Sequence, residues 1–131
     1  MIDMPAPRPR SVLVVQREPD LIGLLLKREG FIVHTADDAR SALHELARTV
    51  PEVVLVDWTL PDTDGVELCR QLKSSEATMR VPTVLMTGSD DLARRATARD
   101  AGARALLGRP FSRDKLMNCV LSAIHGGPQQ D

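Results

Sequence analysis

The chain has 131 residues, which is enough for one domain with a substantial apolar core. Its 17 Lys and Arg residues balance 18 Asp and Glu residues, so composition indicates no attraction to nucleic acid or to a membrane surface. No apolar stretch approaches the roughly 18 residues of a membrane span, and the start of the chain lacks the apolar core of a signal peptide. We therefore expect a cytoplasmic protein with no nucleic-acid or membrane partner and with flexible tails at residues 1–10 and 126–131.

Five short runs rich in Val, Leu, Ile or Thr predict strands, and each is followed by a segment with helical spacing of apolar residues. Two of the runs are almost wholly apolar, which is typical of strands covered by helices on both faces. The predicted strands are Ser11–Val15, Phe31–Thr35, Val53–Val56, Thr83–Met86 and Arg104–Leu107.

The intervening helices carry recognisable start and stop signals. The first begins after Pro19 and ends before Gly30. The third begins at Asp64, which we expect to cap the helix together with Glu67. Five such units predict one α/β domain over residues 11–125, with a parallel sheet and helices on both faces. The other helices are expected at about Asp38–Thr49, at about Asp91–Ala101 and from near Ser112.

Chemically distinctive side chains follow four of the predicted strands. Asp57 ends the third strand, Gln16 and Arg17 follow the first, Thr87 ends the fourth, and Arg109 follows the fifth. Because the carboxyl ends of parallel strands meet at one edge of the sheet, we expect these side chains to share a small cleft. A single polar residue after a strand is ordinary and indicates no function. The presence of such residues after four of the five predicted strands indicates a functional site.

These residues lie within motifs that together resemble the receiver domain of two-component response regulators. The resemblance covers about residues 10–125 and implies a flavodoxin-like fold with strand order 2-1-3-4-5. It also implies a role in signal transduction rather than an enzyme with a turnover substrate. The motifs that carry it are Val12–Pro19, Val56–Gly65, Leu85–Gly88, Gly102-Ala103 and Arg109–Phe111.

The resemblance implies specific roles for several positions. Asp57 stands at the position of the phosphoacceptor, and Thr87 at that of the switch hydroxyl that follows the phosphoryl group. Leu106 stands at the second switch position, where receivers often have Tyr or Phe, whereas this chain contains no Tyr. A cis peptide is implied between Arg109 and Pro110.

The departures from the family pattern concern the metal. Receivers usually carry two acids that hold Mg²⁺ where this chain has Gln16 and Arg17, and a Lys where it has Arg109. The formal charges of Asp57, Arg17 and Arg109 sum to +1. We therefore expect no metal site, with Mg²⁺ binding weak or absent. We also expect Arg17 to pair with Asp57 and to replace the metal electrostatically.

The sequence thus favours an atypical, stand-alone receiver that acts mainly by binding a protein, with little or no Mg²⁺-dependent phosphorylation. The expected partner is a histidine kinase or a downstream effector, meeting the basic face around Arg94–Lys115, and a homodimer is a further option. Two alternatives stay open. One is a conventional phosphorelay receiver that accepts phosphate on Asp57 from a histidine kinase. The other is a sensor of a small anion held by Arg17 and Arg109.

Overall fold

The computed structural model describes residues 10–126, so the two predicted tails lie almost entirely outside the described residues. Strands and helices alternate along the chain, and the strands form one parallel sheet in the order β2-β1-β3-β4-β5. The elements are β1 (Ser11–Val15), α1 (Leu21–Arg28), β2 (Ile32–Ala36), α2 (Ala39–Arg48), β3 (Val53–Asp57), α3 (Gly65–Lys73), β4 (Thr83–Thr87), α4 (Leu92–Asp100), β5 (Ala105–Gly108) and α5 (Arg113–His125).

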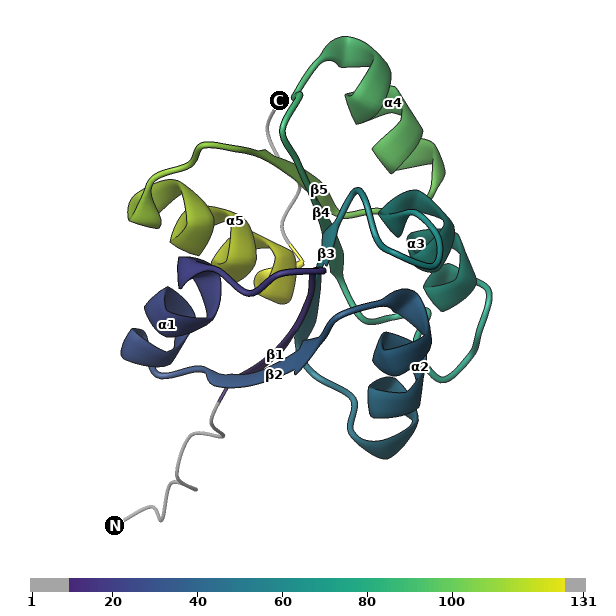
Figure 1. Ribbon diagram of the computed structural model, residues 1–131, viewed down its shortest axis with the longest axis horizontal. Helices are drawn as coiled ribbons and strands as arrows, with labels where there is room; N and C mark the ends of the chain where they lie inside the picture. Colours follow the sequence, from purple (N-terminus) through teal and green to yellow (C-terminus); the bar gives the residue numbers. More distant parts are fainter. Residues whose placement is uncertain (1–9, 127–131) are drawn as a thin grey trace, which may run out of the picture.

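The sheet lies between two layers of helices (Figure 1). Helices α1 and α5 cover one face, and α2, α3 and α4 cover the other. The central strands need cover on both faces because their side chains are apolar on both, and every residue of β4 is buried. The predicted fold class and strand order are confirmed. Within residues 10–126, no helix is both long and apolar enough to cross a membrane.

The predicted element boundaries need small corrections. The second and fifth strands each begin one residue later than expected, at Ile32 and Ala105. Phe31 is buried but closes the turn after α1, because its backbone N–H donates to the Leu26 carbonyl. Asp64 caps α3 as expected, with its carboxylate accepting from the Glu67 backbone N–H at 2.7 Å.

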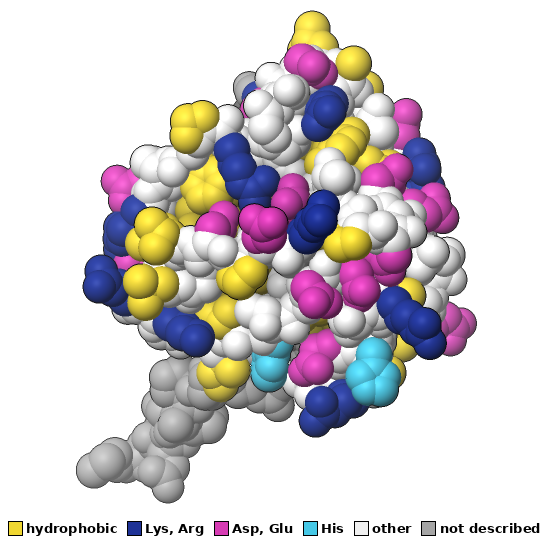
Figure 2. All heavy atoms as spheres, in the orientation of Figure 1, with side chains coloured by type: hydrophobic (Ala, Val, Ile, Leu, Met, Phe, Trp, Pro, Cys, Tyr) yellow, Lys and Arg dark blue, Asp and Glu magenta, His cyan; other side chains and the backbone are white. Residues whose placement is uncertain are grey.

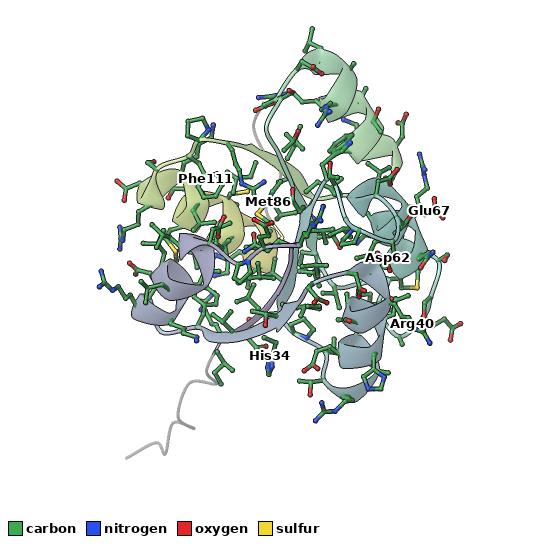
Figure 3. All side chains as sticks on the ribbon, in the orientation of Figure 1. His34, Arg40, Asp62, Glu67, Met86 and Phe111 are labelled. Atoms are coloured by element: carbon green, nitrogen blue, oxygen red, sulfur yellow. The ribbon has the colours of Figure 1, made fainter. Side chains whose placement is uncertain are left out.

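The loop after β3 is fastened to the start of α2. The Asp62 carboxylate accepts hydrogen bonds from the backbone N–H groups of Ala39 and Arg40, each at 3.0 Å. Figure 3 shows Asp62 beside the beginning of this helix. Helix N-termini carry unpaired N–H groups and a partial positive charge, so a carboxylate there is stabilised. The Ala39 N–H is the main cause that holds the pKa of Asp62 below its ordinary value of 3.8.

Replacement of this carboxylate gives a test of the contact. We expect Asp62→Ala to lower the free energy of unfolding by about 0.5–1 kcal/mol. This value lies in the lower part of the range for helix-capping groups, because Asp62 is exposed. The folded-state pKa is depressed, so this contribution is present at neutral pH and is lost as pH falls through the folded-state pKa. Urea unfolding at neutral and at acid pH measures both effects. If the difference in the free energy of unfolding between variant and wild type did not become smaller at acid pH, the contact between the Asp62 carboxylate and the start of α2 would be contradicted.

Candidate functional site

The carboxyl ends of the central strands bring the candidate residues to one edge of the sheet. Parallel register places Asp57 opposite Met86 and Thr87 opposite Gly108. Arg109 follows Gly108 directly, and its backbone N–H donates to the Thr87 carbonyl at 2.7 Å. The polar groups of β3, β4 and β5 therefore lie side by side at the end of the apolar sheet.

An ion pair between Arg109 and Asp57 occupies this edge. Arg109 Nη1 donates to Asp57 Oδ1 at 3.1 Å, and the two side chains are 30% and 24% exposed. Arg109 Nη2 donates to Gln16 Oε1 at 3.4 Å and lies 3.8 Å from Asp20 Oδ2. Gln16 Nε2 in turn donates to Asp20 Oδ1 at 3.2 Å. One guanidinium group thus connects the carboxylate of Asp57 to a closed network with Gln16 and Asp20.

The expectation that Arg17 reaches Asp57 is wrong. Arg17 is exposed, and no hydrogen bond or ion pair joins it to Asp57 in the described part of the chain. Gln16 instead continues the pairing of β1, because its backbone N–H donates to the Ala36 carbonyl, and its side chain is 7% exposed. Gln16 therefore lies against Asp20 and Arg109, whereas Arg17, in the bend that follows, is exposed.

The side chains around Asp57 can be compared with the ligands that a divalent cation requires. Mg²⁺ prefers several oxygen ligands in near-octahedral geometry, usually including carboxylates. Among residues 10–126, no three His, Cys, Asp or Glu side chains converge as a metal-binding group. The charges of Asp57, Asp20 and Arg109 sum to −1, not to the +1 expected with Arg17. The set does not fit a magnesium site, because Arg109 already engages Asp57 and Gln16 supplies only an amide.

The two switch positions lie on the neighbouring strands. Thr87 is 1% exposed, and its hydroxyl oxygen accepts from the Ser89 backbone N–H at 3.1 Å and from Arg94 Nη1. Leu106 is partly buried and packs on the apolar core on the α4 side of the sheet. The implied cis peptide between Arg109 and Pro110 is confirmed.

Four arginines of the predicted basic face around Arg94–Lys115 contact acidic or aromatic side chains. Arg94 lies over the Trp58 ring, and Arg95 forms a two-bond ion pair with Asp90. Arg113 pairs with Glu29 and Asp114, and Arg109 lies in the pocket. Figure 2 shows basic and acidic side chains intermixed on the face that it presents. Ion pairs with Asp90, Asp57 and Glu29 therefore partly compensate the positive charge of this face.

Two residues of the site were missed from sequence. Asp20 had a usable local signal, because it stands just before the periodic segment of α1, where its carboxylate caps Ile22 N–H at 2.9 Å. Its second contact, with Arg109, depends on the distant β5. Arg94 had no local signal, because its partners Thr87 and Trp58 lie on other elements.

The fold and the site define a class: a flavodoxin-like α/β domain with a carboxylate, a hydroxyl and a basic side chain at the carboxyl edge of its sheet. The family model described as the response regulator receiver domain matches residues 12–121. The chain belongs to this family of two-component signalling domains.

Several curated proteins are similar to the chain. It is 33% identical over 112 residues to the transcriptional regulatory protein TrcR of Mycobacterium tuberculosis, covering 83% of this chain and 43% of TrcR. It is 33% identical over 100 residues to the protein PilG of Pseudomonas aeruginosa, covering 76% of this chain and 74% of PilG. Identity to the phosphate regulon regulator PhoB of Rhizobium meliloti is 34%, covering 87% of this chain and 52% of PhoB. The chain thus spans about half the length of such transcriptional regulators, and its stand-alone character stays a prediction.

Solved structures show the same fold. A putative response regulator from Chloroflexus aurantiacus has a TM-score of 0.86 and 25% identity, covering 90% of this chain and 99% of that one. The receiver domain of the sensor histidine kinase PA1611 from Pseudomonas aeruginosa has a TM-score of 0.81 and 26% identity, covering 90% and 99%. That structure contains a magnesium ion coordinated in its active site cleft.

A close backbone approach beneath Asp57 gives a testable prediction. A Cβ atom on Gly65, the first residue of α3, would lie 2.2 Å from the Asp57 carbonyl oxygen. We expect Gly65→Ala to lower the free energy of unfolding by about 1–3 kcal/mol, because backbone must move to relieve the overlap. Gly88→Ala is the matched control, since no heavy atom lies within 4 Å of a Cβ there. Equal urea stability of the two variants would contradict the packing described.

Proposed function

We propose that the chain is a cytoplasmic receiver that acts mainly by binding a protein partner, with Arg109 in the place of a divalent cation at Asp57. In this proposal it has little or no Mg²⁺-dependent phosphorylation and no turnover substrate. The finding that supports it best is the contact of Arg109 Nη1 with Asp57 Oδ1.

In this proposal, the Arg109–Asp57 hydrogen bond opposes metal binding and phosphorylation at Asp57. A hydrogen bond to a charged group contributes about 1.5–3 kcal/mol net. A cation or a phosphoryl group at Asp57 Oδ1 would compete with Arg109, whose other nitrogen is engaged by Gln16 and Asp20.

The surface formed by β5 and α5 supports a protein partner. An open groove of about 390 Å³ runs there, with both apolar and polar walls. Leu106 stands in it where an aromatic side chain would fill more space, and Lys115 supplies positive charge. A histidine kinase or a downstream effector is the proposed partner class, at the Leu106–Lys115 part of the predicted face. The groove is lined by Leu106, Leu107, Ser112, Asp114, Lys115, Asn118, Cys119 and Ser122.

A conventional phosphorelay role is the second candidate. The side chain of Asp57 stays 24% exposed, and a similar receiver, that of PA1611, holds magnesium in its cleft. The anion-sensor alternative has less support, because Arg17 is exposed and, within residues 10–126, Arg109 is the guanidinium group that contacts Asp57.

Incubation with acetyl phosphate, with and without Mg²⁺, separates the two candidates. We expect no metal-dependent phosphorylation of the wild type, measured by intact mass, because Arg109 occupies the acceptor carboxylate. Trp58 is the only tryptophan and adjoins Asp57, so its fluorescence gives an independent measure of metal binding. We expect this signal to stay unchanged in a millimolar Mg²⁺ titration.

A triple variant tests the physical reason. With the native Asp57, the changes Gln16→Asp, Arg17→Asp and Arg109→Lys give three carboxylates and one ammonium group, and this variant is expected to gain metal-dependent phosphorylation. The same variant with Asp57→Asn is the control and should lose it. Metal-dependent labelling of the wild type at Asp57 would instead establish the phosphorelay role.

A further inference from the structure

We propose that Arg94 is a positioning residue that couples helix α4 to the Thr87 hydroxyl and to Trp58. Arg94 Nη1 donates to Thr87 Oγ1, and the guanidinium carbon lies 4.6 Å from the centroid of the Trp58 ring. One α4 side chain thus contacts the residue after Asp57 and the hydroxyl at the end of β4. This coupling does not depend on whether Asp57 accepts a phosphoryl group.

The Thr87 hydroxyl forms hydrogen bonds with Ser89 and Arg94. Thr87 Oγ1 donates to the Ser89 carbonyl at 3.3 Å and accepts from the Ser89 N–H and from Arg94. All of these partners lie in the β4–α4 connection or in α4 itself. A hydroxyl has one proton and two lone pairs, so this set satisfies it fully. Any group bound at Asp57 that needs this hydroxyl must displace at least one of them.

The attachment of α4 makes the Arg94 contacts important. Only Ala98 of this helix is buried, whereas α3 buries five residues. Leu92, at the start of α4, is 85% exposed. Figure 1 shows α4 at the periphery of its layer, beyond α3. A helix with so little apolar burial opens at low free energy, so polar contacts, among them the part-buried Arg94 over Trp58, contribute to holding α4 in place.

Coupling of this kind acts in both directions. Release of Arg94 by an occupant that takes the Thr87 hydroxyl would loosen α4. A protein partner that engages Arg94 would, by the same free energy, free the hydroxyl for the pocket. Arg94 therefore links the surface of α4 to the edge of the sheet at Asp57, with Trp58 as the internal reporter.

Fluorescence of the full chain tests the stacking contact. Trp58 is the sole tryptophan, and the chain has no Tyr, so its emission and acrylamide quenching report this site alone. We expect Arg94→Gln to raise the quenching of Trp58 and to speed amide exchange in α4 but not in α2. Arg94→Lys keeps the charge without the planar fork, and we expect an intermediate result. It also provides a folded variant if Arg94→Gln is unstable.

A double-mutant cycle tests the hydrogen bond. Thr87→Val keeps the shape of the side chain and removes the hydroxyl. Each single variant changes the unfolding equilibrium constant by some factor. We expect the factor for the double variant Thr87→Val/Arg94→Gln to be about threefold smaller than the product of the two single factors. Thr87→Val with Arg95→Gln is the control pair, because Arg95 forms its ion pair with Asp90. Multiplicative effects in the Arg94 cycle, or Trp58 quenching unchanged by Arg94→Gln, would overturn the proposal.

Discussion

The contact between Arg109 and Asp57 spans 52 residues of sequence and joins the end of β3 to the end of β5 across β4. It requires the register that places Thr87 opposite Gly108, because this pairing brings Arg109 level with the carboxylate. The same guanidinium also reaches Gln16, at the end of β1. A single side chain therefore crosslinks the carboxyl edge of the sheet, and the chemistry open to Asp57 depends on how firmly it is held.

The electrostatics of the pocket depend on geometry more than on the number of charged residues nearby. Arg17 is adjacent to Gln16 in sequence but contributes no contact to Asp57, whereas Asp20 lies 3.8 Å from Arg109. The resulting formal charge is −1, so the environment does not repel a cation through its net charge. The feature that sets the local chemistry is instead the hydrogen bond that Asp57 Oδ1 accepts from Arg109.

The rest of the domain divides between firmly packed and weakly packed elements. Strands β3 and β4 are almost completely buried, and α3 is seated so closely that Gly65 has no room for a Cβ beside Asp57. Helix α4 buries only Ala98 and depends on polar and cation–π contacts. Polar contacts exchange partners at lower cost than apolar packing, so the contact of α4 with Thr87 and Trp58 opens more easily than the packing of α3.

The sequence by itself determined the fold class, the strand order implied by the family resemblance, and the edge of the sheet at which Asp57 and Thr87 lie. These follow from local signals: apolar runs of strand length, helix caps such as Asp64, and polar residues directly after each run. Only the tertiary structure decided that Gln16 contacts Arg109, that Arg17 is exposed, and that Arg95 and Arg113 pair with acidic side chains. Local patterns set where a residue stands along a strand, whereas the direction of its side chain beyond the strand end depends on distant partners.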